Sequence, residues 1–303
     1  PAAAEETTNP TQHKPATAAT TTTTSRALAK IPVVYVFFAG KIPASHYLWS
    51  STRISSRFAP IVLLLGQQVG VPPTVTSLKH VTVVRTSTLV TPEMRALRDH
   101  YFPLGYREPY ARETMERYFA LLAWMDRANV DVVFNADGDV AVVRDLGIDG
   151  GKWERMGCDS HLDLGRSGSH MTFAAHQWAV SGHSSVLRRD VLAGFCAFTL
   201  DVYRAPSSNV TNTVAARVRE FLVEHRTGEH GFVSDMTLWW WFIALSSKWG
   251  DEWGAVDALR RLKVVDMPPL AQRRRFTFCD GQELGFDHKR GFRGDWSNLK
   301  TLH

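Results

Sequence analysis

Two carboxylates separated by a single glycine, Asp137-Gly138-Asp139, are the clearest chemical feature of the sequence. Two acids this close repel each other unless a cation or a set of strong donors lies between them. Hard divalent cations such as Mg²⁺ or Mn²⁺ bind carboxylate oxygens and keep coordination positions open for substrate phosphates. The glycine permits a tight turn that directs both side chains to one side. All three are also ordinary turn residues, so a polar turn without a ligand is the competing interpretation.

An amphipathic helix and an apolar strand precede these acids. Between residues 108 and 129, four apolar side chains recur at spacings of four, three and three residues, which places them on one face of a helix that ends at Asn129: Met115, Phe119, Leu122 and Met125. Residues 130–134 (VDVVF) then have the composition of a buried strand. Because ligands in open α/β sheets bind at the carboxyl ends of strands, we expect a ligand site at Asp137 and Asp139.

Three more apolar runs predict buried strands earlier in the chain. They are residues 31–39 (IPVVYVFFA), 61–65 (IVLLL) and 81–84 (VTVV). The second and third runs each follow a segment that could be helical. This alternation favours an α/β fold with a mostly parallel sheet flanked by helices.

The sequence around the two acids resembles a known family. A helix that carries Arg117 and Phe119 (ERYFALLAWM), followed by VDVVFNADGDVAVV, is similar to the D-x-D region of GT-A-type nucleotide-sugar glycosyltransferases, and IPVVYVFFAG is similar to their first strand. The resemblance covers most of residues 31–303 and implies a mixed, mostly parallel, Rossmann-type GT-A sheet. It departs from the family where Asn135-Ala136 precede the motif in place of the usual acidic or aromatic pair, so we assign no subfamily.

The resemblance implies an activity and its partners. The enzyme would be a metal-dependent hexosyl- or pentosyltransferase that moves a sugar from a nucleoside diphosphate-sugar, a UDP-sugar foremost, to a glycan or protein-linked acceptor. Mn²⁺ or Mg²⁺ would bind Asp137, Asp139 and His303. An inverting enzyme needs a base aligned with the acceptor hydroxyl, whereas a retaining one does not, and the motifs do not encode which applies.

The resemblance also assigns roles to single residues. Asp235 would contact the acceptor or serve as the base. Residues 179–184 would form a small-residue turn that lines the donor-sugar pocket. The donor and its nucleotide would be bound by Asp137, Gly138, Asp139, Arg117, Ser181, Gly182 and Lys300.

Each assignment has a plainer alternative. Arg117 could pair with Glu113 four residues earlier on the helix, and Asp235 could cap the helix that follows it. His183 and His303 could be ordinary histidines. The three consecutive tryptophans at 239–241 occupy successive helical faces, so at least two should pack in the core and one is available to stack on a sugar.

Composition and charge exclude several classes of protein. With 44% hydrophobic residues the chain can bury a large core and is not disordered as a whole. The longest apolar run, residues 238–245, is too short to cross a bilayer, so membrane attachment would need a segment outside this chain. The net charge of +5 is not gathered into a large patch beyond Arg273-Arg274-Arg275, and we expect no nucleic-acid partner.

The ends of the chain suggest domain limits and a compartment. Residues 1–26 are rich in Thr, Ala and Pro, which predicts a disordered stem or linker ahead of a single catalytic domain at 27–303. Together with an N-x-T triplet at 209–211, this composition favours the Golgi lumen or another part of the secretory pathway. Three cysteines, at 158, 196 and 279, fit either one disulfide and one thiol or three thiols.

Two rival functions remain open at the level of sequence. A metal-dependent phosphohydrolase or nucleotidyltransferase also uses paired acids after a strand, but no nucleophile motif or P-loop accompanies them here. A non-catalytic carbohydrate-binding module would draw on the ten tryptophans.

Overall fold

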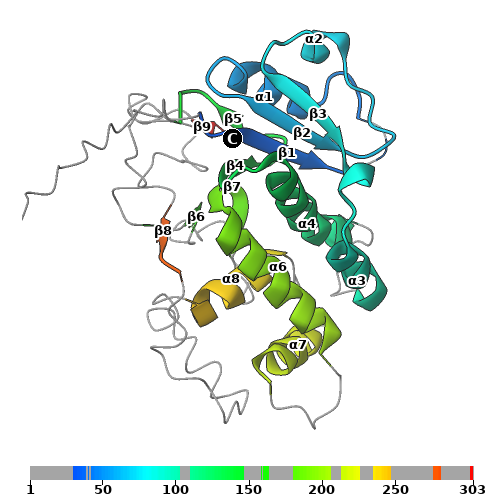
Figure 1. The fold of residues 1–303 in the computed structure, drawn as a ribbon, viewed down its shortest axis with the longest axis vertical. Coiled ribbons are helices and arrows are strands. Elements are labelled where there is room, and N and C mark those ends of the chain that lie inside the picture. The colour runs from blue at the N-terminus through cyan, green and yellow to red at the C-terminus, as the bar shows by residue number, and fades with distance from the viewer. Residues whose placement is uncertain are drawn as a thin grey trace, which may run out of the picture.

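A seven-stranded sheet with helices on both faces forms the framework of the protein (Figure 1). The structure is a computed structural model and describes residues 30–38, 40, 42–102, 110–146, 158, 160–163, 180–205, 213–225, 235–246, 276–280 and 301–302. The sheet has the strand order β3-β2-β1-β4-β7-β6-β8. A separate two-stranded sheet pairs β5 with β9.

Four parallel strands make up the first part of the main sheet. They are β1 (Val33–Phe37), β2 (Ile61–Leu65), β3 (Val81–Arg85) and β4 (Val132–Ala136). Strand β7 (Ser181–Arg188) runs antiparallel to β4 and to β6 (Ser160–Asp163), which pairs in parallel with β8 (Phe278–Asp280). The prediction of a mixed, mostly parallel α/β sheet is therefore confirmed.

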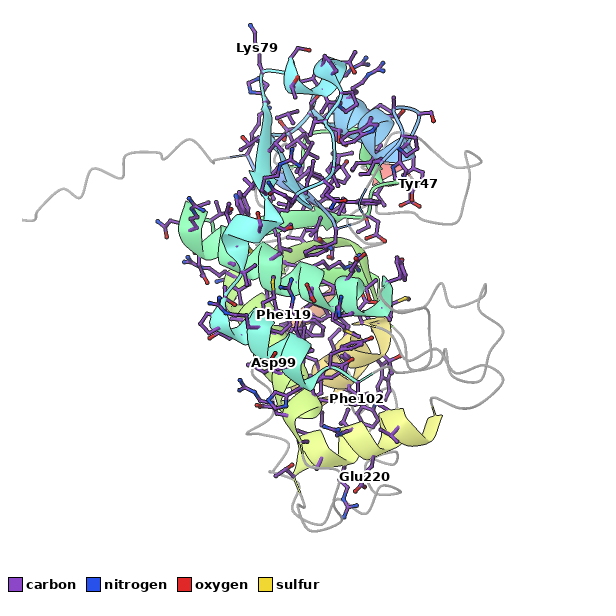
Figure 2. The ribbon with its side chains drawn as sticks, turned by 90° about the vertical axis from the view of Figure 1, so that its right-hand side faces the viewer. Tyr47, Lys79, Asp99, Phe102, Phe119 and Glu220 are labelled. Atoms are coloured by element: carbon purple, nitrogen blue, oxygen red, sulfur yellow. The ribbon has the colours of Figure 1, made fainter. Side chains whose placement is uncertain are left out.

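The two faces of the sheet carry two separate hydrophobic cores. On one face lie α3 (Pro92–His100), α4 (Tyr110–Ala128), α6 (Arg189–Arg204), α7 (Val214–His225) and α8 (Asp235–Ser246), with the short 3₁₀ helix η1 (Thr86–Leu89) at the sheet edge. On the other lie α1 (Tyr47–Ser55) and α2 (Pro73–Thr76). Lys79, beside α2, and Glu220, on α7, mark opposite ends of the molecule (Figure 2). Within the described part of the chain, no helix combines the length and apolarity needed to cross a membrane.

Helix α4 is the element that links the sequence pattern to the site. Its predicted apolar stripe faces the core, where Met115, Phe119 and Met125 are buried. The helix ends at Ala128, and the next residue, Asn129, adopts a left-handed φ of 51°. The amide of Val130 then donates to the carbonyl of Met125, 2.9 Å away, which is the closing hydrogen bond of a Schellman motif. This abrupt ending lets the chain turn directly into β4.

The strand limits differ from the predictions in two instructive places. Strand β4 begins and ends two residues later than the predicted run 130–134 and so includes Asn135 and Ala136. The segment 179–184 was expected to be a turn, which is wrong for residues 181–184, because they begin strand β7. The predicted stem at 1–26 and the N-x-T triplet at 209–211 lie outside the described residues.

Gly66 is required where the loop after β2 passes the end of β1. Its amide donates to the carbonyl of Phe37, 2.8 Å away. A Cβ added at Gly66 would lie only 2.6 Å from the backbone oxygen of Phe38, which cannot move without disturbing β1.

We therefore expect Gly66→Ala to lower the free energy of unfolding by about 1–3 kcal/mol, because a backbone clash must be relieved. Gly70→Ala is the matched control, since nothing lies within 4 Å of the Cβ it would add. Urea denaturation of both variants measures the difference. Equal stabilities would contradict the close approach.

Candidate active site

The Asp137-Gly138-Asp139 turn follows β4 at the centre of the main sheet, between β1 and β7. The turn is closed by the amide of Val140, which donates to the carbonyl of Asp137 at 3.0 Å. The carboxyl end of a central strand is where an open α/β sheet offers its ligand crevice. The two acids thus follow the carboxyl end of a buried central strand, as the sequence predicted.

A chain of buried hydrogen bonds fixes this turn to β1 and α1. The hydroxyl of Tyr35 donates to the carbonyl of Val140 at 2.9 Å and lies 2.8 Å from the hydroxyl of Ser55. Ser55 in turn accepts from the amide of Val142 at 2.8 Å. Val140 and Val142, which follow the acids, are therefore both held by buried hydrogen bonds, so the acids lie on a rigid segment.

The first residue of α1 covers the glycine of the turn. A Cβ on Gly138 would lie 3.3 Å from Cε2 of Tyr47, so the turn and this ring are in close contact. Tyr47 is 52% exposed and projects from the surface (Figure 2), and its ring packs on His46 with centroids 3.8 Å apart. Burial and the nearby Asp139 and Asp137 raise the pKa of Tyr47, whereas burial lowers that of His46 despite Asp139. An aromatic pair therefore forms one wall beside the acids.

Arg117 joins the two acidic parts of the site. From α4, its Nη1 binds Oδ1 of Asp137 at 2.5 Å and its Nη2 binds Oδ2 of Asp235 at 2.8 Å. Asp235 is the first residue of α8 and is buried. Arg117 does not pair with Glu113, so the local helical alternative is wrong and the pairing spans 118 residues of sequence.

Tyr118 completes this network from the same helix. Its hydroxyl accepts from Nη2 of Arg117 at 2.7 Å and donates to Oδ2 of Asp235 at 3.0 Å. The carboxylate of Asp235 is thus bound to side chains. It does not cap α8, as the plainer sequence interpretation had suggested, because Asp235 is the first helical residue and its carboxylate accepts no amide hydrogen bond from the described residues of α8.

One oxygen of each bridged carboxylate is left available. Within the described part of the chain, Oδ2 of Asp137 and Oδ1 of Asp235 accept no hydrogen bond. The side chain of Asp137 is 38% exposed and that of Asp235 only 6%. Arg117 therefore positions both acids and leaves an oxygen on each for a ligand.

Burial and charge act in opposite directions on the bridged groups. Burial raises the pKa of Asp235, and Arg117 opposes that rise. Burial disfavours the charge of Arg117, but Tyr118, Asp137 and Asp235 together hold its pKa well above the usual value. The guanidinium therefore stays charged, and Asp235 is a stronger base than an exposed aspartate.

Gly182 lies against this network from β7. Its carbonyl accepts from Nδ2 of Asn135 at 2.5 Å and from the hydroxyl of Ser185 at 3.0 Å. A Cβ at Gly182 would collide with the hydroxyl of Tyr118 and lie 3.4 Å from Nε1 of Trp239. That indole nitrogen is buried and has no hydrogen-bond partner among the described residues. Gly182 is thus needed to let β7 approach α4 and α8.

Asp137 and Asp139 fit a divalent cation that is completed by substrate. Among the described residues, no three His, Cys, Asp or Glu side chains gather closely enough to hold a metal ion. Mg²⁺ and Mn²⁺ sites often use only one or two carboxylates, with phosphate oxygens and water filling the rest. Strand β9 (Thr301–Leu302) pairs antiparallel with β5 (Ala141–Val142), which begins two residues after Asp139. His303, the predicted third metal ligand, and Lys300, predicted to bind the donor, flank β9 in sequence and lie outside the described residues.

The structure therefore brings five of the predicted site residues together: Arg117, Asp137, Gly138, Asp139 and Asp235. Gly182 joins them through Tyr118, and Ser181 begins the same strand. Their roles in binding and catalysis stay predictions. Tyr118, Tyr47 and Asn135 were not predicted. Tyr118 had a signal, because it is a polar-tipped residue beside Arg117 on the buried side of α4, whereas Tyr47 had none.

The tryptophans do not form a carbohydrate-binding surface in the described residues. Trp239, Trp240 and Trp241 are all buried, so the prediction that one of them is available to stack on a sugar is wrong. Trp49 and Trp124 are buried as well. The described tryptophans therefore give no support to a binding module, and the other five of the ten lie outside the described residues.

Comparisons with known proteins give similar structures but no related sequence. No family model matches the chain, and no curated protein matches it in sequence. Among solved structures it is similar to the glycosyltransferase GlyE of Streptococcus pneumoniae TIGR4, at 13% identity and a TM-score of 0.36 over 79% of this chain. It is also similar to mouse xyloside xylosyltransferase 1 (10% identity, TM-score 0.38, 69% of this chain and 80% of that one).

A third similar structure is the bifunctional glycosyltransferase WbbM, at 16% identity and a TM-score of 0.30, covering 58% of this chain and 34% of that one. The chain spans about half the length of GlyE, at 52%. All of these TM-scores are low, so the similarity assigns no function to this chain.

Tyr118 offers a direct test of the network. We expect Tyr118→Phe to lower the free energy of unfolding by about 1–3 kcal/mol, because buried Asp235 loses a donor. Tyr203→Phe is the matched control, since the hydroxyl of Tyr203 is equally buried but has no partner, and its removal should be neutral or stabilising. Urea denaturation compares the two. A cost shared equally by both variants would show that the Tyr118 hydroxyl contributes nothing specific.

Proposed function

We propose that this chain is the catalytic domain of a metal-dependent glycosyltransferase. Its donor is a nucleoside diphosphate-sugar, a UDP-sugar foremost, and its acceptor is a glycan or a protein-linked sugar. The observation that carries the proposal is the bridge that Arg117 makes between Asp137 and Asp235 at the carboxyl end of β4, with Asp139 two residues after Asp137 in the same turn. It combines a place for a cation and diphosphate with a separate buried carboxylate.

Asp139 and the available oxygen of Asp137 would hold Mn²⁺ or Mg²⁺. The bound ion supplies Lewis-acid stabilisation of the leaving diphosphate. The pairing of β9 with β5 supports a role here for Lys300 and His303, because it brings residues 301–302 beside the strand that follows the acids. A lysine at this place would neutralise phosphate charge.

Asp235 is suited to the acceptor side of the reaction. In the transfer, the bond between the anomeric carbon and the diphosphate oxygen breaks, and its electron pair leaves with the diphosphate. A new bond forms to the acceptor oxygen, which loses its proton. Oδ1 of Asp235 is available to accept a hydrogen bond or that proton, while Arg117 and Tyr118 hold Oδ2 in place. Its pKa, raised by burial, favours proton acceptance.

Ser181 and Gly182 are proposed to line the donor-sugar pocket. Gly182 adjoins Tyr118 and the unpartnered indole nitrogen of Trp239. Tyr118 fills the space over the Cα of Gly182, so Gly182 would act by bringing the start of β7 close to the network of Arg117 and Asp235.

The decisive experiment is calorimetric titration with UDP and then GDP, each with and without Mn²⁺. We expect UDP binding that requires Mn²⁺ and that falls at least about tenfold in Asp139→Asn, because a charged ligand to the cation is lost. Asp190→Asn is the control, since Asp190 is an exposed acid on α6, and it should bind as the wild type does.

Three other outcomes would change the proposal. Binding of GDP alone would keep the transferase and change the donor class. Binding of neither nucleotide by folded protein would overturn the transferase. Release of inorganic phosphate from UDP without sugar transfer would favour a phosphohydrolase.

We further propose that the domain matures in the secretory pathway, in the Golgi lumen or nearby. Cys158 is disulfide-bonded, whereas Cys196 is a free and buried thiol. Structural disulfides form in oxidising compartments. Cys279 is the remaining cysteine of the chain and belongs to β8, which pairs with β6. A bond between Cys158 and Cys279 would fasten the outer strands of the sheet.

This pairing predicts the thiol count. Protein denatured without reductant should react with iodoacetamide at Cys196 alone, and after reduction at all three cysteines. Mass spectrometry of the alkylated protein measures both counts, and Cys196→Ala should leave no reactive thiol before reduction. Three reactive thiols without reductant, in protein from a secreting host, would contradict the disulfide.

A further inference from the structure

Arg117 contacts two acidic side chains of the site. Asp137 and Asp139 lie two residues apart, and the guanidinium of Arg117 binds Asp137 and Asp235 at once. The guanidinium therefore meets two carboxylates directly, and a third acid follows one of them in the same turn. The side chain of Arg117 is only 15% exposed, and its Nε is buried without a partner.

We propose that Arg117 is a resident counter-ion of the Asp137–Asp139 turn, which keeps divalent-cation binding weak until an anionic diphosphate is present. This inference rests on the proposed function and concerns how its metal site is tuned. Arg117 acts here as a positioning residue, because it changes the charge and the free oxygens that Asp137 offers.

The geometry supports competition between the guanidinium and a cation. Arg117 occupies Oδ1 of Asp137 at 2.5 Å, so one oxygen of that carboxylate is available. A charged guanidinium this close also repels any dication bound by the same carboxylate. Removing that charge should therefore tighten cation binding by about three- to thirtyfold, as Coulomb's law gives for one unit charge at a high effective dielectric constant.

The diphosphate reverses this balance. Its negative charges attract both the cation and Arg117, so binding of diphosphate and cation should be strongly coupled in the wild type. The coupling is reciprocal, since each ligand changes the affinity for the other by the same factor. Without the guanidinium, the bare site already binds the cation, and the gain from the diphosphate should be smaller.

A purely structural role for Arg117 predicts the opposite sign. If the guanidinium only held Asp137 in place, its loss would misplace a ligand and weaken cation binding. The direction of the change in affinity therefore separates the two roles.

The test is titration of Mn²⁺ followed by electron paramagnetic resonance of the free ion, with and without UDP. We expect Arg117→Gln to bind Mn²⁺ alone about three- to thirtyfold more tightly than the wild type, with a smaller gain on adding UDP. Arg117→Lys keeps the charge and should lie near the wild type. Arg112→Gln is the matched control on the same helix, because Arg112 pairs with Glu116 and should leave Mn²⁺ binding unchanged.

Asp235→Asn gives a second test that preserves shape. It removes a negative charge and leaves Arg117 to Asp137 alone, so Mn²⁺ should bind about three- to thirtyfold more weakly. This variant keeps the inference falsifiable if Arg117→Gln does not fold, because unchanged binding would contradict it. Unchanged or weaker Mn²⁺ binding in folded Arg117→Gln, or unchanged binding in Asp235→Asn, would overturn the inference. Absence of Mn²⁺ binding by the wild type, with UDP present, would instead overturn the proposed function.

Discussion

The salt bridge from Arg117 to Asp137 and Asp235 is the interaction on which the site depends. It joins α4, the end of β4 and the start of α8, which are distant in sequence. A buried guanidinium loses hydration, and this loss is offset only when its donors meet acceptors in good geometry. The planar fork of arginine meets two carboxylates at once, which a lysine ammonium would not do with the same precision.

The two hydrophobic cores place this salt bridge with little freedom. One core holds α4 and α8 against the sheet, where Trp239 stacks on Phe195 with ring centroids 3.8 Å apart. The other core holds α1, from which Ser55 reaches Tyr35 and the exit of the acidic turn. The acids thus lie where both layers end at the carboxyl edge of the sheet. Hydrogen bonds connect the turn to both faces: Ser55 and Tyr35 bind its exit from the α1 side, and Arg117 binds Asp137 from α4.

Local pattern predicted the strands and the helix well, because burial there follows periodicity. Residues 61–65 form β2 as predicted, and the stripe of α4 faces the core. Pattern failed where long-range contacts decide. Nothing near Arg117 in sequence indicates that it prefers Asp235, which lies 118 residues later, over Glu113. Small residues at 179–184 indicated a turn, yet the space left by Gly182 is what admits Tyr118 beside β7. The end of the chain at β9 is likewise placed by pairing with β5 rather than by any local signal.

The two carboxylate oxygens of Asp235 differ in their hydrogen bonds. A carboxylate with both oxygens bound by charged donors would be a weak base, and one with neither bound would be free to rotate. Here Arg117 and Tyr118 share Oδ2, and Oδ1 carries no hydrogen bond among the described residues. Burial raises the pKa while Arg117 limits that rise, so the group stays ionisable and keeps its orientation. The same guanidinium that binds Asp235 also binds Asp137, so the proposed acceptor side and the proposed diphosphate side of the site share one charged group.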